Sequence, residues 1–597
     1  MAFQSRFIPA LSAITLFFLI GATPAAQSED LYAPSTTAGP ALLPVVTPVA
    51  ECSALASADL SSAVGSATHI TSAIAVKNGE PAPYCDVKGY VAPEIQFEVR
   101  LPLAKWTQRF VQIGCGGLCG MLNINVEHDD NCMPAQNGEL ALASTDMGHS
   151  GNSDGSWGAK DYQLRIDFAY RGVHVTALAA KALIAAFYGQ APKYSYFAGC
   201  SDGGREALME AQRFPKDFNG ITAGAPAMNF VTQNTFYHGW NTRVNTRADG
   251  KPILTADKLP ILHKAALAKC DADDGVKDGL INRPWECHFD PSVTECKPGE
   301  NPAECLTPAQ VKVAREIYAG AHDSEGNKLV LSGLMPGSEL SWAGVVIPNV
   351  GQDSAMGKAA STGVLKYIAY ENNPPDSYTL ADLKFDRATF AETTKLHALY
   401  DATDPDLSAF ASAGGKLIVW HGLADPHISP INSIAYYTAM QQQMGKQAVD
   451  KFARLYLFPG GYHCGQGEGP FEVDLLSAIM AWVEGAHAPD ALIASHKAGA
   501  DPRGPGTGAP SGGTGTSASP ANAEAKMPDR TRPIFPYPFT ARFTGNGSSD
   551  DASNFVEGSP EPVPALLLNW LGSSFYTPHY ELWCVGSSAS MECKQTP

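Results

Sequence analysis

The residues best suited to chemistry lie in the segment Gly199–Gly203, which reads Gly-Cys-Ser-Asp-Gly and fits the G-x-S-x-G pattern. In that pattern a serine lies on a sharp turn between a strand and a helix, and the glycines leave space beside it. The helix dipole favours the negative charge that acyl transfer creates. Because glycine-rich turns with a serine are also common without any catalytic role, Ser201 needs partners elsewhere in the chain.

Suitable partners follow two later apolar runs that are typical of buried strands. A serine hydrolase built on a parallel sheet has its serine, acid and histidine in that chain order. Asp425 follows the run Lys416–His421, and His463 follows the run Ala453–Pro459. We predict that Ser201 is the nucleophile, that His463 is the general base and that Asp425 orients this base.

Four nearby residues are weaker candidates for these roles. His421 ends its predicted strand, where it could bond to backbone, and His427 is too close to Asp425 to be presented independently. Asp404 and Asp406 precede the strand instead of following it, so we interpret both as residues of a solvated loop.

The chain contains 13 cysteines, and two of them adjoin the proposed catalytic residues: Cys200 precedes Ser201, and Cys464 follows His463. If serine and histidine are within hydrogen-bond reach, their neighbours can approach the Cα separation of about 6 Å that a disulfide needs. We therefore predict a Cys200–Cys464 disulfide over the alternative of two buried thiols. The other predicted pairs are Cys52–Cys85, Cys270–Cys287, Cys296–Cys305 and Cys584–Cys593, while the partners within Cys115, Cys119 and Cys132 stay open.

An oxyanion hole needs two backbone N–H groups near the reacting carbonyl. The amide of Asp202, directly after the nucleophile, is one candidate. The second is Gly117, with Gly116 as the alternative, because this glycine-rich loop follows the predicted strand Arg109–Ile113.

The elements that must position these residues alternate between strand and helix. Apolar runs predict strands at 95–101, 109–114, 140–146, 194–198, 220–226, 416–421 and 453–459, and helical spacing predicts helices at 166–188, 205–213, 431–444 and 473–482. This alternation predicts an α/β fold with a parallel sheet covered on both faces. The irregular segment 228–403 interrupts the alternation, and an insertion there would act as a lid.

Composition and the N-terminus limit the partners and the compartment. Acidic residues outnumber basic ones by 60 to 42 in 597 residues, a formal charge of −18, which argues against nucleic acid as a partner. Arg6, the apolar run Phe7–Gly21 and the small residues before Ala26 are typical of a signal peptide. A membrane anchor is the less favoured alternative, because a bilayer span needs about 20 apolar residues. We expect a secreted or periplasmic protein with no membrane association after cleavage; the oligomeric state is not indicated.

The motifs together resemble the tannase and feruloyl esterase family. The matching segments are Gly199–Glu206, Arg213–Pro215, Gly224–Pro226, His421–Asp425, Pro459–Cys464 and Arg532–Pro533. The resemblance implies an α/β-hydrolase core with a large lid, a Ser-Asp-His triad and a disulfide beside serine and histidine. The expected organisation is a signal peptide at 1–26, a core at 27–227 and 404–545 with a flexible insertion at 498–528, a lid at 228–403 and a C-terminal tail at 546–597.

An acidic loop within the segment 228–403 concentrates carboxylates around glycines. Oxygen ligands at this spacing suit Ca²⁺, although a solvated acidic turn explains the composition equally well and the EF-hand pattern is not matched. The family resemblance favours a structural Ca²⁺ in the lid and no organic cofactor. By analogy, the ligands are the side chains of Asp271, Asp274 and Asp278 and the carbonyls of Val276 and Leu280.

The resemblance also implies a carboxylesterase that acts on small esters of aromatic acids. Feruloyl esters are the first expected substrate and galloyl esters the second. Terephthalate monoesters are less favoured, because Leu329–Pro375, the expected specificity region, contains no arginine, although Lys358 and Lys366 could pair with a carboxylate. Two different classes of protein would also fit parts of the pattern: a non-catalytic, Ca²⁺-stabilised binding protein and a serine peptidase.

Overall fold

The computed structural model describes residues 39–159, 161–497, 529–562 and 568–595. The predicted signal peptide at 1–26 and the predicted flexible insertion at 498–528 lie outside these residues.

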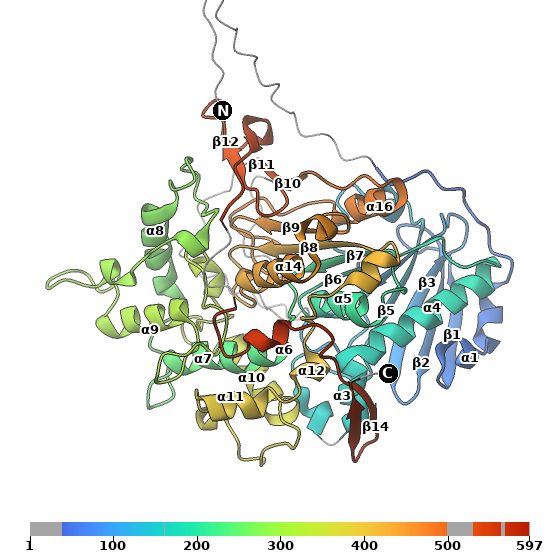
Figure 1. Cartoon of the computed structure of the whole chain (residues 1–597), viewed down its shortest axis with the longest axis horizontal. Helices are drawn as coiled ribbons and strands as arrows, with labels where there is room; N and C mark the ends of the chain where they lie inside the picture. Colours follow the sequence, from blue (N-terminus) through green and yellow to red (C-terminus); the bar gives the residue numbers. More distant parts are fainter. Residues whose placement is uncertain (1–38, 160, 498–528, 563–567, 596–597) are drawn as a thin grey trace, which may run out of the picture.

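A nine-stranded mixed sheet forms the centre of the molecule, with the order β1-β2-β3-β5-β4-β6-β7-β8-β9 (Figure 1). β1, β2, β3 and β5 pair antiparallel, and every pair from β5–β4 to β8–β9 is parallel. The strands are β1 (Thr68–Val76), β2 (Tyr84–Val91), β3 (Ile95–Pro102), β4 (Arg109–Ile113), β5 (Leu140–Thr145), β6 (Tyr194–Cys200), β7 (Gly220–Gly224), β8 (Lys416–Gly422) and β9 (Ala453–Phe458).

Helices cover both faces of this sheet. Because successive residues of a strand point to opposite sides, alternate residues of β8 pack against different helices. Leu417 and Val419 of β8 pack in the larger core with residues of α4 (Gly172–Tyr188), α5 (Asp202–Arg213) and α14 (Pro430–Met444). Ile418 and Trp420 pack in a second core with α16 (Leu475–Gly485). The predicted covering of both faces is therefore present, but the sheet is mixed and not purely parallel, since β3 pairs antiparallel with β2 and β5.

Two features of the core differ from the elements that the sequence predicts. β1 and β2 form an antiparallel hairpin at the edge of the sheet, where the apolar runs predict no strand. The predicted helix 166–188 consists of α3 (Tyr162–Ile166), a π-helical turn at Asp167–Arg171, and α4. The buried Arg205 guanidinium donates to the carbonyls of Phe168 and Ala169, so the widened turn supplies these acceptors.

The segment between β7 and β8 contains helices and loops but, in its described residues, no strand of the sheet, and it lies beside the sheet (Figure 1). Its helices, here called the insertion helices, are α6 (Phe230–Thr232), α7 (His238–Val244), α8 (Leu259–Cys270), α9 (Pro308–Ala319), α10 (Met356–Tyr367), α11 (Arg387–Thr393), α12 (His397–Tyr400) and α13 (Ser408–Ser412). The remaining short helices are α1 (Ser61–Val64), α2 (Met133–Gln136) and α15 (Lys446–Val449).

The C-terminal region, whose role the sequence left open, connects the insertion to the core. The hydroxyl of Tyr580 accepts a hydrogen bond from the backbone N–H of Thr403. The ring of Trp583 packs edge-on against the rings of Tyr170 and Phe214. After α16 the described chain forms three small antiparallel strand pairs. They are β10 (Leu492–His496) with β11 (Arg530–Ile534), β12 (Ala541–Phe543) with β13 (Phe555–Glu557), and β14 (Trp583–Gly586) with β15 (Met591–Lys594).

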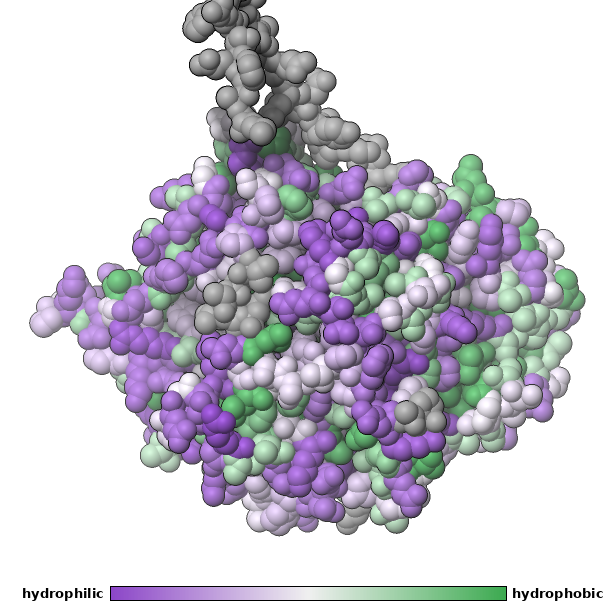
Figure 2. Space-filling view, viewed as in Figure 1, coloured by the Kyte–Doolittle hydropathy of each residue, from purple (hydrophilic) through white to green (hydrophobic). Residues whose placement is uncertain are grey.

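The face shown in Figure 2 is mostly hydrophilic, and its hydrophobic residues are scattered in small groups. Within the part of the chain that the structure describes, no helix has the length and apolarity needed to cross a membrane.

A buried ion pair joins the central strands to α16. Arg109 of β4 donates from Nε and Nη2 to the two carboxylate oxygens of Glu484, each at 2.7 Å, and both side chains are at most 1% exposed. Tyr196 of β6 donates its hydroxyl to the same carboxylate at 2.7 Å. The charge of Glu484 is thus fully partnered, which a buried carboxylate requires.

Removing one partner of this pair should destabilise the protein. We expect Glu484→Gln to lower the free energy of unfolding by about 3–5 kcal/mol, because the Arg109 charge would stay buried without its counter-ion. Urea denaturation measures this change. The matched control is Glu51→Gln at an exposed position, which should leave the denaturation midpoint unchanged. An unchanged midpoint for Glu484→Gln would contradict the role of the pair.

Candidate active site

The turn that carries Ser201 is a strained connection between β6 and α5. Ser201 has φ 65° and ψ −120°, a conformation that residues with side chains rarely adopt. A Cβ added at Gly199 would lie 2.4 Å from the carbonyl oxygen of Gly203, and one added at Gly114 would lie 2.6 Å from the Cα of Gly203. Gly199 is therefore needed for the turn, and Gly114 for the contact of the turn with the loop after β4.

His463 and Asp425 come together at the carboxyl edge of the sheet, from the loops after β9 and β8. Nδ1 of His463 lies 2.7 Å from Oδ2 of Asp425. Because Asp425 only accepts, Nδ1 carries the proton, and Nε2 is left as the basic nitrogen. The basic Nε2 is the atom that must reach Oγ of Ser201 during the reaction.

Asp425 lies in an environment that keeps it ionised. Its other oxygen, Oδ1, accepts the backbone N–H groups of His427 at 2.7 Å and Ile428 at 3.1 Å. Burial alone would raise the pKa of Asp425, but the charge of His463 and the hydrogen bonds from His421 and His463 outweigh burial and lower this pKa. An ionised Asp425 can stabilise an imidazolium on His463.

His421 does more than bond to backbone. Its Nε2 lies 3.0 Å from the carbonyl oxygen of Ile428 and 3.2 Å from Oδ2 of Asp425. Both partners accept, so Nε2 is the protonated nitrogen, and Nδ1 can accept from Ser433 Oγ at 2.8 Å. The geometry makes His421 a support for Asp425. This contact was missed from the sequence, although the spacing of four residues was visible there.

His427 and Asp404 lie in surroundings that exclude them from the triad. The ring of His427 is buried 4.6 Å from the ring of His463, and burial together with the His463 charge lowers the pKa of His427 well below its ordinary value. The expectation that Asp404 lies in a solvated loop is wrong. Asp404 is 2% exposed and accepts the backbone N–H groups of Asp406 and His579, because the C-terminal region covers it.

A disulfide joins the turn of Ser201 to the loop of His463. Cys200 and Cys464 are bonded, with their Cα atoms 5.8 Å apart. Since each cysteine adjoins a candidate catalytic residue, the bond ties the loop of His463 to the turn of Ser201. The structure also contains the pairs Cys52–Cys85, Cys270–Cys287, Cys296–Cys305 and Cys584–Cys593.

The sequence left the pairing of Cys115, Cys119 and Cys132 open. In the structure Cys115 and Cys119 form a disulfide, and Cys132 is a buried free thiol. The ring closed by this bond contains Gly116 and Gly117, and we call it the oxyanion loop. Neither glycine N–H, nor that of Asp202, donates to a described residue. These three amides are therefore available to a ligand.

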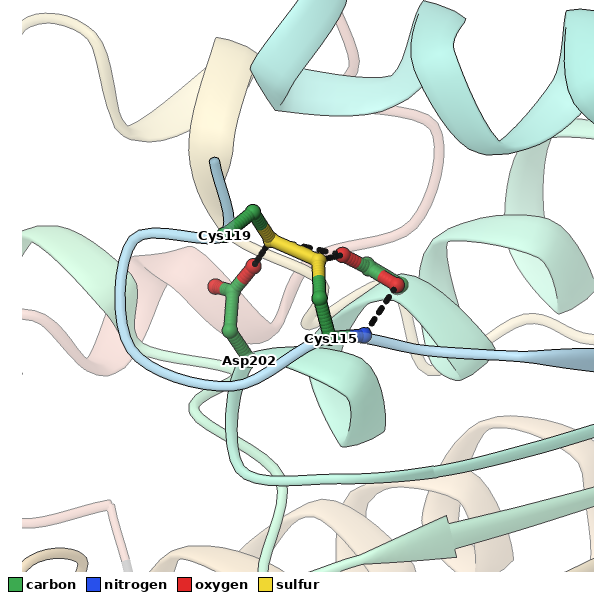
Figure 3. A group of neighbouring side chains, drawn as sticks. Cys115, Cys119 and Asp202 are labelled. Atoms are coloured by element: carbon green, nitrogen blue, oxygen red, sulfur yellow. Dashed lines mark hydrogen bonds between the residues drawn. A yellow bond between two sulfur atoms is a disulfide. The ribbon is translucent and has the colours of Figure 1, made fainter. Parts of the chain in front are cut away.

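A buried acidic group lies under the oxyanion loop (Figure 3). Arg205 donates to both carboxylate oxygens of Asp202, and Glu206 Oε2 accepts the N–H of Cys115 at 3.3 Å. Burial and the neighbouring charge of Asp202 raise the pKa of Glu206 well above its ordinary value. Burial thus favours the protonated form of Glu206 over its carboxylate. Neither Arg205 nor Glu206 was assigned a role from the sequence.

Comparisons with known proteins show the family to which this chain belongs. A family model described as "Tannase and feruloyl esterase" matches residues 77–557. The chain belongs to this family. A mono(2-hydroxyethyl) terephthalate hydrolase from Piscinibacter sakaiensis is 31% identical over 80% of this chain and 85% of its own length. A probable feruloyl esterase B-1 from Aspergillus flavus is 32% identical over 67% of this chain and 75% of its own length.

A solved structure supports the same assignment. The crystal structure of an esterase from Aspergillus oryzae superposes with a TM-score of 0.68 at 26% identity, covering 82% of this chain and 97% of that chain. The predicted α/β-hydrolase fold and the resemblance to the family are confirmed. The protein is a carboxylic ester hydrolase.

Two groups of side chains in the described residues are close enough to hold a metal ion, and neither is the predicted calcium loop. Cys115 and Cys119 contribute to the first group with Asp202 and Glu206, but a disulfide sulfur has no thiolate with which to bind a metal. The second group is His174, Glu210 and Asp217, where Lys181 lies 3.6 Å from Asp217 and already supplies a positive charge.

The predicted calcium loop has a donor set of the right chemistry. Burial, together with the charge of Asp278, raises the pKa of Asp271 and raises that of Asp274 to about 6, so negative charge is only partly balanced there. Arg532 of β11 forms an ion pair with Asp278 and supplies one balancing charge. These oxygen donors fit Ca²⁺, which would hold the loop by binding the carboxylates of Asp271, Asp274 and Asp278 and the carbonyls of Val276 and Leu280.

Removal of Ca²⁺ should lower thermal stability if the loop holds the ion. We expect EDTA to lower the Tm by at least about 2 °C and added Ca²⁺ to restore it, since a ligand bound only to the folded state stabilises that state. Differential scanning calorimetry measures the shift. Asp274→Asn is the matched control, because it removes one ligand charge and its Tm should no longer respond to EDTA. A wild-type Tm that ignores EDTA would contradict calcium binding.

Proposed function

We propose that the protein is a secreted serine carboxylesterase that hydrolyses esters of hydroxycinnamic acids such as ferulic acid, with Ser201 as nucleophile. The observation that carries the mechanism is the His463–Asp425 contact of 2.7 Å, on a loop bonded by Cys464 to the residue preceding Ser201. This arrangement supports a triad assembled from three loops that follow three different strands.

In the first half of the reaction, Ser201 Oγ attacks the ester carbonyl while His463 Nε2 takes its proton. Asp425 holds the proton on Nδ1 and stabilises the imidazolium. The amides of Asp202 and Gly117 donate to the tetrahedral oxygen, and His463 then protonates the departing alcohol. In the second half, His463 activates water, which attacks the acyl-enzyme and releases the acid.

The substrate class rests on the relatives. The family model and the Aspergillus flavus relative are named for feruloyl esterase, which favours an aromatic acyl group. The Piscinibacter sakaiensis relative acts on a terephthalate monoester, whose free carboxylate calls for a cationic partner. The segment 329–375 supplies lysines but no arginine for this purpose, so a feruloyl ester is the better proposal and a galloyl ester is the second.

Export is part of the proposal. Six disulfides are typical of proteins that fold in an oxidising compartment, and they support secretion or a periplasmic location. The N-terminal pattern of a signal peptide agrees with this location.

Replacing the nucleophile tests the mechanism. Ser201→Ala should lower kcat for methyl ferulate by about 10⁴-fold or more and leave the Tm near that of the wild type, because only the attacking oxygen is lost. A stopped spectrophotometric assay and a thermal melt measure the two quantities. Activity within tenfold of the wild type would rule out Ser201 as the nucleophile.

A substrate panel tests the acyl specificity. We expect kcat/KM for methyl ferulate to exceed that for methyl gallate, and both to exceed that for mono(2-hydroxyethyl) terephthalate, because no arginine is offered to the free carboxylate. Product release is measured by chromatography at equal enzyme concentrations. A higher kcat/KM for the terephthalate monoester would reverse the proposed order while leaving the serine mechanism intact.

A further inference from the structure

The oxyanion loop has a covalent feature that the triad does not require. Its disulfide spans only four positions in sequence, from Cys115 to Cys119. Inside the ring lie Gly116 and Gly117, and Gly117 has φ 67°. Adjacent glycines have more backbone freedom than any other pair, so an amide donor placed there is costly to hold in one position. Closing the ring removes much of that freedom before a substrate arrives.

The ring is also anchored on the outside. Leu118 donates its backbone N–H to the carbonyl of Asn152 at 2.7 Å, and Cys119 donates to the carbonyl of Gly116 at 3.0 Å within the ring. A Cβ added at Gly117 would lie 2.6 Å from the same Asn152 oxygen. The neighbouring loop at Asn152 therefore fixes one side of the ring.

The sulfur atoms of the disulfide lie against the carboxyl groups of Glu206 and Asp202. Sγ of Cys115 is 2.7 Å and Sγ of Cys119 is 3.1 Å from Oε1 of Glu206, and Sγ of Cys119 is 3.3 Å from Oδ2 of Asp202 (Figure 3). A disulfide sulfur carries no hydrogen, so a hydrogen bond at this place needs a proton on the carboxyl group of Glu206. The other oxygen of Glu206 accepts the Cys115 N–H. The carboxyl group of Glu206 thus contacts both ends of the ring.

This contact connects the two halves of the oxyanion hole. Glu206 and Asp202 belong to α5, the helix that begins at the Ser201 turn, whereas Gly117 belongs to the loop after β4. The side chains of Cys115, Cys119, Asp202 and Glu206 are all buried. The position of the Gly117 amide relative to the Asp202 amide therefore depends on the contact between Glu206 and the disulfide.

We propose that the Cys115–Cys119 disulfide and Glu206 are positioning elements that hold the oxyanion-loop amides in place for the transition state. The proposal rests on the proposed serine mechanism, because an oxyanion hole has a function only if Ser201 forms a tetrahedral intermediate. It assigns roles to a disulfide and to a buried acid that neither the triad nor the disulfide at Cys200 explains.

The double variant Cys115→Ser, Cys119→Ser tests the role of the disulfide. We expect kcat for methyl ferulate to fall about 10- to 100-fold with KM changed less than about threefold, since removing one oxyanion donor costs about 10²- to 10³-fold and loosening it costs less. The affinity for an arylboronic acid, which forms a tetrahedral adduct with a serine, should fall in parallel, and that for ferulate should not. A folded double variant with wild-type kcat overturns the proposal.

The control removes another short disulfide, near the C-terminus of the chain. Cys584→Ser with Cys593→Ser opens the β14–β15 pair and should leave kcat within about twofold of the wild type. An equal loss of kcat in both double variants would assign the effect to general destabilisation and overturn the proposal.

Glu206 gives a second test that leaves all disulfides in place. Glu206→Gln retains a donor for the sulfur and an acceptor for the Cys115 N–H, whereas Glu206→Ala retains neither. We expect Glu206→Ala to lose at least about tenfold more kcat than Glu206→Gln, and equal kcat values would overturn the role of Glu206. Ser201→Ala is run beside these variants. If Ser201→Ala is inactive and the cysteine variant is fully active, only this inference fails; an active Ser201→Ala would overturn the mechanism and the inference together.

Discussion

Close backbone contact between the Ser201 turn and the loop after β4 is the constraint on which the rest of the site depends. The turn at Ser201, with φ 65°, and the loop after β4 can pack this closely because Gly199 and Gly114 have no Cβ. The same contact brings the oxyanion loop beside the start of α5. The proposed nucleophile and oxyanion donors are therefore positioned by one packing arrangement, which a side chain at Gly199 or Gly114 would disrupt.

The other proposed catalytic groups reach this turn from distant parts of the sequence. β8 and β9 follow a long helical segment, yet both run parallel to β7 and end at the same edge. Asp425 and His463 therefore meet without any local sequence relationship between them and Ser201. The Cys200–Cys464 bond then limits how far the histidine loop can move from the serine turn, a restriction that hydrogen bonds between exposed loops would not provide.

The order of strands, the turn and the partner loops could be predicted because each has a local signature, such as the apolar run Lys416–His421 or the glycines around Ser201. The edge hairpin β1–β2 was missed since strands such as Thr68–Val76 are half-exposed and lack a continuous apolar run. Glu206 could not be assigned because a carboxylate at that position suits an exposed helix face as well. Only the packing of the disulfide against it shows that it is buried and that its pKa is raised.

The cysteine that has no disulfide partner, Cys132, affects how stable the six disulfides are against exchange. Cys132 is buried, and burial raises the pKa of its thiol to about 11. Near pH 7 only about one molecule in 10⁴ then carries the thiolate, which is the form that attacks a disulfide. Thiol–disulfide exchange initiated by Cys132 is correspondingly slow once the core has closed around it. A folded chain with an odd number of cysteines can in this way protect its six disulfides from exchange with the remaining thiol.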